Sequence, residues 1–138
     1  LNNNNSEVSG LRLMGSYVFN KARVGAIFES TSSDDQAQWD RDVFGFNGSL
    51  DVGNDTALNA QILMADDYDG TPESGATMIT FGIFKKLEKR VDVYAVYTTT
   101  SNDDNASYQG IDGGHGDEMT TTSGGNPNAL SVGFVYSI

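Results

Sequence analysis

Apolar side chains recur at every second position along most of this chain, and this period constrains the fold more than any other feature of the sequence. Neighbouring residues of an extended strand point to opposite faces, so a period of two indicates strands with one apolar face. No stretch shows a convincing helical period. Seven segments of about ten residues carry the alternation; they lie near residues 11–19, 22–29, 42–51, 56–65, 76–85, 91–98 and 129–138.

The connections between these segments alternate between short and long. Short ones lie at residues 20–21, 52–55 and 86–90, and long ones at 30–41, 66–75 and 99–128. The long connections, counted with Asp42, hold thirteen of the 19 acidic residues and a single base, Arg41. Five of the 8 basic residues lie at the short end. The pattern predicts an up-and-down antiparallel sheet with an acidic end and a basic end.

Composition excludes several classes of function. A net charge of −11 argues against nucleic acid, because phosphate binding requires a basic surface. The chain has no cysteine and one histidine, so disulfides and thiolate or histidine-based metal centres are not expected. That histidine, His115, lies among glycines, and no catalytic constellation accompanies it. We therefore expect no enzymatic activity. No apolar run approaches the roughly 18 residues of a membrane-spanning helix.

Two architectures fit seven alternating strands. A soluble β-sandwich used for binding or adhesion would bury the apolar face as a core. A transmembrane β-barrel would turn that face to lipid, with strands of about ten residues, short turns at one end and long loops at the other. The asymmetry of the connections favours the antiparallel up-and-down transmembrane barrel. A third possibility is a β-rich structural protein whose open edges pair between copies.

In a barrel, the arginines fix which face meets water. An arginine facing lipid near mid-bilayer costs roughly 2–4 kcal/mol, so Arg12 and Arg23 are expected to point inward. The alternative is that these arginines only balance the nearby charges of Glu29 and Asp92. The predicted pore-lining residues are Arg12, Arg23, Glu29, Asn59, Gln61, Asp92 and Tyr94.

Three stretches resemble the general porins of Gram-negative bacteria. Residues 81–98 read FGIFKKLEKRVDVYAVYT, similar to the hairpin near the end of those proteins. Residues 10–20, GLRLMGSYVFN, resemble a porin strand followed by a tight turn. Residues 129–138, ALSVGFVYSI, are similar to the C-terminal strand that the outer-membrane assembly machinery reads, although family members usually end in Phe. On this resemblance, the assembly-signal residues are Leu130, Val132, Phe134, Tyr136 and Ile138.

The resemblance implies a water-filled channel in the Gram-negative outer membrane that passes small hydrophilic solutes and ions by passive diffusion. It also implies contact with outer-membrane lipid and lipopolysaccharide, a 16-stranded barrel and a homotrimer. Residues 1–138 are then a single barrel segment holding about seven C-terminal strands. Its expected parts are an extracellular loop remnant (1–10), six strands (11–98), a long extracellular loop (99–128) and the C-terminal strand (129–138).

Seven strands alone would leave two open edges. Each unsatisfied backbone group in hydrocarbon costs several kcal/mol, so further strands, or other copies of the chain, are expected to pair with these edges. The excess of acid predicts a mild cation preference, weakened because charge is screened beyond about 8–10 Å at physiological salt. No firm metal or cofactor is expected. Loop acids could still hold Ca²⁺ or Mg²⁺ together with lipopolysaccharide, although solvated loops without an EF-hand pattern are the alternative; these acids are Asp34, Asp35, Asp66, Asp67 and Asp69.

Overall fold

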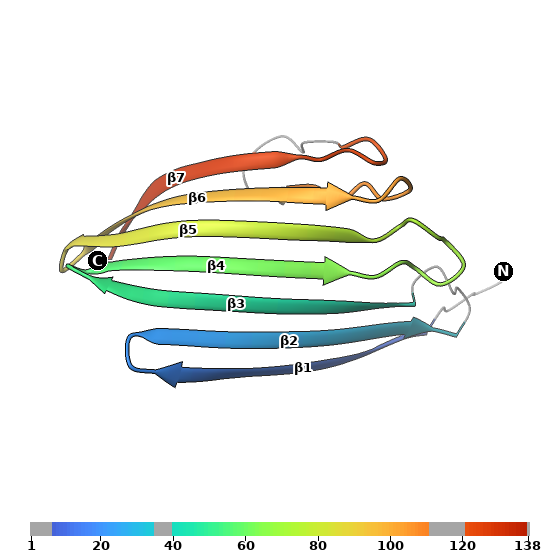
Figure 1. Ribbon diagram of the computed structural model, residues 1–138, viewed down its shortest axis with the longest axis horizontal. Coiled ribbons are helices and arrows are strands. Elements are labelled where there is room, and N and C mark those ends of the chain that lie inside the picture. The colour runs from blue at the N-terminus through green and yellow to red at the C-terminus, as the bar shows by residue number, and fades with distance from the viewer. Residues whose placement is uncertain (1–6, 35–39, 111–120, 138) are drawn as a thin grey trace, which may run out of the picture.

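One antiparallel sheet makes up the computed structural model, which describes residues 7–34, 40–110 and 121–137. Its strands pair in chain order from β1 to β7, as Figure 1 shows. The described residues contain no helix, and hence none that could cross a membrane. The predicted all-β, up-and-down sheet is confirmed. The strands are β1 (Val8–Phe19), β2 (Ala22–Ser33), β3 (Arg41–Gly53), β4 (Thr56–Ala65), β5 (Ala76–Glu88), β6 (Val91–Asn102) and β7 (Asn128–Tyr136).

Most strands extend further than the alternation predicts. β1 begins at Val8, so Val8–Gly10 pair with β2 and do not belong to a loop. β6 continues to Asn102, which pairs with Ala76, so the loop after it begins later than predicted. These extensions consist mainly of Ser, Thr and Gly, which keep the backbone ladder without marking it by an apolar face. Only β4 has the predicted bounds, and Ile138 lies outside the described residues.

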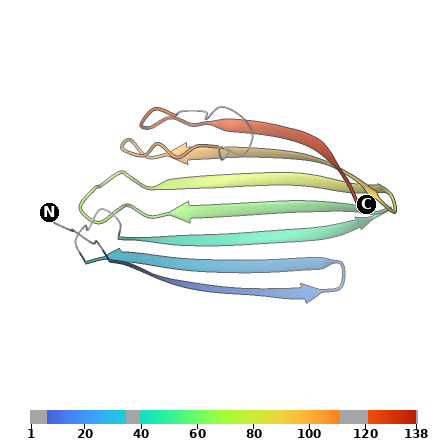
Figure 2. The same cartoon turned by 180° about the vertical axis from the view of Figure 1, so that it is seen from behind.

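Tight turns gather at one end of the sheet and long loops at the other, which Figures 1 and 2 show from the two sides. The turn between β3 and β4 has two residues, Asn54 and Asp55, at φ 52° and 55°. Two consecutive left-handed residues are typical of the type I′ turn, which Asn and Asp tolerate better than most residues. The length of this turn and its two residue types therefore fix the β3–β4 register at this end.

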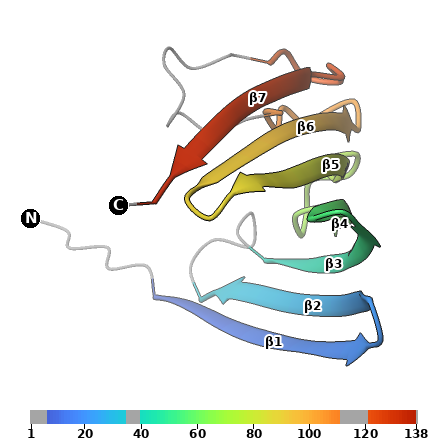
Figure 3. The same ribbon diagram turned by 90° about the vertical axis from the view of Figure 1, so that its left-hand side faces the viewer.

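The sheet is curved, so that its seven strands follow an arc when viewed end-on (Figure 3). Residues paired across neighbouring strands share a face, and the pairs define one apolar face and one face that mixes polar residues with apolar ones such as Ile27, Leu63 and Met78. We call the mixed face the polar face. Large apolar side chains such as Leu130, at 71%, and Phe134, at 73%, are highly exposed. Within the described residues, Ala106 is the one buried hydrophobic residue and no second sheet covers the apolar face. The sandwich alternative is therefore wrong.

Candidate functional site

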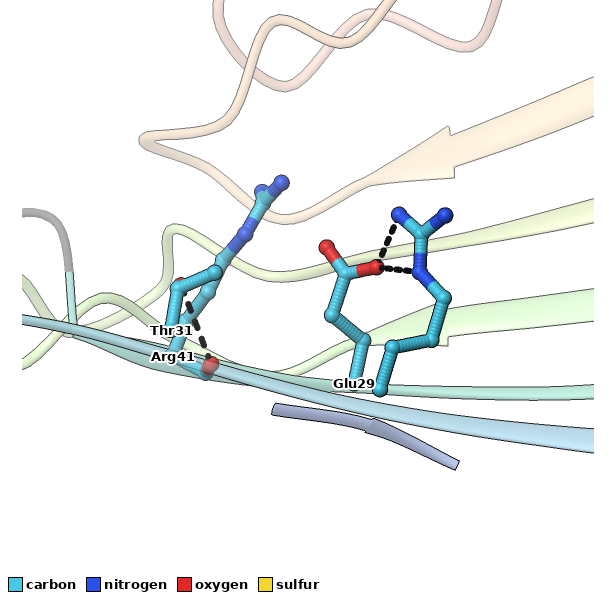
Figure 4. A network of polar contacts seen from close by, with 4 residues as sticks. Glu29, Thr31 and Arg41 are labelled. Carbon is cyan, nitrogen blue, oxygen red and sulfur yellow. Dashed lines mark hydrogen bonds and ion pairs between the residues drawn. The ribbon is translucent and has the colours of Figure 1, made fainter. Parts of the chain in front are cut away.

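The polar face of the sheet carries most of the charged and amide side chains of the strands, whereas Asp42, Lys85 and Asn128, near strand ends, lie on the other face. Cross-strand pairing joins Arg12 to Glu29 on one line, and Arg23 to Ser49 and then Asn59 on another. Glu29 and Arg41 project from the same side of the sheet, toward the strands of the opposite flank (Figure 4). We call this side the concave face and the apolar side the convex face. All seven residues predicted to line a pore lie on the concave face.

Arg12 and Glu29 form an ion pair across β1 and β2, in which Nε and Nη2 of the arginine both contact Oε2 of the glutamate (Figure 4). The Arg12 side chain is 58% exposed and that of Glu29 is 26% exposed. A pair this accessible to water contributes at most about 1 kcal/mol to stability. Its main effect is local neutralisation of one positive and one negative charge on the concave face.

Arg23 is placed differently, because no ion pair is found for it within the described parts of the chain. It is exposed and lies beside Asn47, Asn59 and Gln61 at a hollow of about 430 Å³ in the concave face. The side-chain oxygen of Asn59 is buried and has no hydrogen-bond partner among the described residues. Among the described residues, this part of the concave face therefore presents one positive charge without an ion-pair partner, beside neutral amides.

Aromatic rings pack over glycines near the tight-turn end of the concave face. The rings of Phe84 and Tyr94 stack with centroids 5.9 Å apart and an interplanar angle of 27°. Tyr94 lies over Gly133, where a Cβ atom would be 2.6 Å from the tyrosine hydroxyl oxygen. Only glycine leaves room for the ring in this position. Asp92 lies on the same face, directly opposite Lys86 in the register of β5 and β6.

The described parts of the loop between β6 and β7, residues 103–110 and 121–127, contact the other end of the concave face. Asn102, which is 8% exposed, donates from Nδ2 to the carbonyls of Tyr108 (2.9 Å) and Gly125 (2.6 Å). Its Oδ1 accepts the Tyr108 backbone N–H at 2.9 Å. Thr100, 1% exposed, donates to the Gln109 carbonyl at 3.4 Å. Because Thr100 and Asn102 point to the concave face, the loop residues that they bond, Tyr108, Gln109 and Gly125, lie on the concave side.

The loop between β4 and β5 is organised around Asp67. Its carboxylate accepts backbone N–H groups from Ser74 at 2.7 Å, Gly75 at 2.8 Å and Glu73 at 3.1 Å. Desolvation would raise the pKa of Asp67, but these hydrogen bonds to the charged form outweigh it and lower the pKa. Glu73 adopts a φ of 60° within this turn. The charged carboxylate thus holds the loop in one conformation.

Arg41, at the start of β3, connects both of these loops through its side chain. Its guanidinium carbon lies 4.9 Å from the Tyr68 ring centroid and 5.4 Å from that of Tyr108. Arg41 also donates a hydrogen bond to the Tyr108 hydroxyl. The acidic loop end, formed by residues 40–42, 66–75 and 103–110, is called the rim below. Arg41 lies in the rim at a hollow of about 670 Å³, whose lining includes Asp40, Asp42, Asp66, Asp67 and Asp69.

The family model for Gram-negative porins matches residues 1–105. The chain belongs to the Gram-negative porin family. Among solved structures it is similar to the anion-selective porin from Comamonas acidovorans, with a TM-score of 0.82 and 21% sequence identity. The match covers 95% of this chain and 39% of that porin, so the chain spans well under half of its length. A search of the curated proteins finds no match.

These comparisons confirm the predicted family and fold class. At 21% identity the structural likeness shows a shared fold: the sheet matches part of a porin barrel. At the family level, membership places the chain among the Gram-negative outer-membrane β-barrel proteins.

The predicted loop cation ligands are only partly described in this porin. Asp35 lies outside the described residues, as does His115. Asp66, Asp67 and Asp69 line one hollow, yet no group of three or more His, Cys, Asp or Glu side chains that could hold a metal ion occurs in the described ranges. The Asp67 carboxylate is instead bound to backbone N–H groups.

The four described residues of the predicted assembly-signal strand lie on the convex face of β7, and their role stays a prediction. Sequence reasoning missed Asn102, Tyr68 and Tyr108 as organisers of the rim. One signal for Arg41 was present, since it is the only base in the long connections. Its aromatic partners lie 27 and 67 residues further along the chain, and nothing in the sequence pairs them.

Proposed function

We propose that this chain forms part of the wall of a water-filled channel for passive diffusion of small hydrophilic solutes and ions. One observation carries the proposal: the register divides the sheet into an apolar convex face and a concave face with charges, amides and hydroxyls. A transmembrane barrel requires this division, with lipid outside and water inside.

The two ends and two edges of the sheet are consistent with the same proposal. Tight turns at one end and long acidic loops at the other match the periplasmic and extracellular ends of an outer-membrane barrel. β1 and β7 each pair with one neighbour in the described residues. Backbone groups cannot remain unpaired in hydrocarbon, so we propose that further strands complete a 16-stranded barrel in a homotrimer. Lipid would contact the convex face, and lipopolysaccharide would contact the rim. Divalent cations would bridge the rim carboxylates and the lipopolysaccharide.

Ion preference can be proposed from the charges of the rim and wall. Carboxylates outnumber Arg41 at the rim, which favours cations near the mouth at low salt. Arg23 favours the opposite preference deeper in the wall, and the similar porin of Comamonas acidovorans is named anion-selective. We propose a mild cation preference. The sign of the reversal potential across a salt gradient separates the two alternatives.

The full-length porin, purified in detergent and inserted into planar bilayers, tests the channel itself. We expect discrete conductance steps that increase in proportion to the conductivity of the bath, as a water-filled pore requires. Proteoliposomes should also swell in small sugars and not in large ones. Folded protein that inserts into the bilayer but gives neither conductance nor swelling would refute the proposal.

A further inference from the structure

Arg41 and Tyr108 join parts of the porin that are not neighbours in the sheet. Arg41 begins β3, whereas Tyr108 belongs to the loop after β6, and β4 and β5 lie between these two strands. The hydrogen bond and the ring contact between the two residues therefore cross the concave side of the rim. Tyr68, in the loop after β4, lies against the same guanidinium. The contact therefore joins two parts of the curved sheet that are separated by β4 and β5.

The side chain of Arg41 is suited to holding two loops in a fixed position, a role that we call a strut. Among the described residues its guanidinium makes no ion pair, although Asp40, Asp42 and Asp66 line the same hollow. Its partners are instead two aromatic rings and one hydroxyl. A planar guanidinium can stack on a ring and donate in its own plane, which a lysine ammonium cannot reproduce.

The backbone of the rim forms a connected unit around this side chain. The Asp69 N–H donates to the Asp40 carbonyl at 2.9 Å, and the Asn105 N–H donates to the Glu73 carbonyl at 2.7 Å. Asn105 also donates from its side chain to the Pro72 carbonyl at 2.9 Å. These bonds link neighbouring loops in sequence around the arc. The Arg41 side chain alone, among the described contacts, spans from β3 to the β6–β7 loop.

We propose that Arg41 is a positioning residue that holds residues 103–110, the first part of the β6–β7 loop, inward at the extracellular mouth and so sets the size limit for solutes. This inference rests on the proposed channel function. Burial and the hydrogen bond to Tyr68 raise the pKa of Tyr108 to about 12, although the neighbouring Arg41 guanidinium acts to lower it. The hydroxyl therefore stays protonated through the physiological range.

Hydrogen exchange of the full-length porin in detergent tests the strut without any measurement of conduction. In Arg41→Ala we expect amides of residues 105–110 to exchange at least about tenfold faster, while those of β3 to β6 stay unchanged. Arg41→Lys should restore only part of the protection, since charge alone does not replace the planar contacts. The matched control, Lys89→Ala, removes an exposed base from the opposite end and should change nothing in the rim.

Liposome swelling then tests the size limit. Arg41→Ala should raise the ratio of trisaccharide to monosaccharide permeation several-fold, whereas Lys89→Ala should not. Unchanged loop exchange in Arg41→Ala would overturn the strut. Faster exchange with an unchanged permeation ratio would overturn the size limit. A wild-type porin that passes no solute would refute the channel function, and the exchange result would still decide whether Arg41 positions the loop.

Discussion

A matched pair of arginine substitutions in β4 tests which face of the sheet meets lipid. Ile62 lies on the convex face between Phe46 and Ile79, and Gln61 lies on the concave face between Asn47 and Thr80. The two residues are adjacent, so they share strand, depth and secondary structure. Ile62→Arg would place a charge in hydrocarbon, and Gln61→Arg would place the same charge in the proposed aqueous lumen.

The expected magnitudes differ clearly. An arginine on the lipid face of a barrel costs roughly 2–4 kcal/mol near mid-bilayer, which lowers the folding equilibrium constant roughly 30- to 800-fold. On the water-filled side we expect about 0.5 kcal/mol or less, as for other solvated positions. The measurement is reversible folding of the full-length porin into lipid vesicles, titrated with guanidinium chloride. Equal costs for the two variants, or a larger cost for Gln61→Arg, would refute the assignment of the faces.

Three further predictions concern the wall and the rim. Arg23→Ala should shift the reversal potential toward cations by about a twofold permeability ratio, because a unit charge about 8 Å from a passing ion is worth about 0.5 kcal/mol in water; no shift would contradict an Arg23 charge that acts on passing ions. Gly133→Ala should cost about 1–3 kcal/mol by overpacking against Tyr94, and Tyr94→Ala in the same chain should recover most of it. The lowered pKa of Asp67 means that its carboxylate stabilises the β4–β5 loop at neutral pH, and that this contribution is lost as pH falls below about 4. Amide shifts of Ser74 and Gly75 should follow that titration by NMR and should not do so in Asp67→Asn.

The fold was predictable to a large extent from the sequence because lipid and water impose opposite requirements on alternate residues. Leu58, Ala60 and Ile62 alternate with Asn59 and Gln61, and this pattern gives both the strand and its two faces. Strand ends were harder to predict where Ser, Thr and Gly continue the backbone pairing. The extension of β2 to Ser33 is one case, because hydroxyl side chains do not indicate which face of the sheet a residue belongs to.

The rim could not be predicted, because its contacts join residues distant in sequence through individual side chains. Asn102 has the side-chain groups to bond both Tyr108 and Gly125, yet nothing in the chain marks it from other polar residues before β7. The high content of acidic residues in the long loops predicts that these loops are solvated. The structure instead orders much of them by backbone hydrogen bonds and by the single base, Arg41.

The most direct test of the central claim is a cysteine scan along β4, a strand of a segment whose 138 residues include no cysteine. Single cysteines at residues 58–63 would be exposed to a charged, membrane-impermeant thiol reagent while current through the reconstituted porin is recorded. The account predicts that current changes on modification at Asn59, Gln61 and Leu63, which share the concave face, and stays constant at the alternate positions. Current changes at every position, at none, or at the convex positions alone would contradict a sheet with one face in lipid and the other in a water-filled channel.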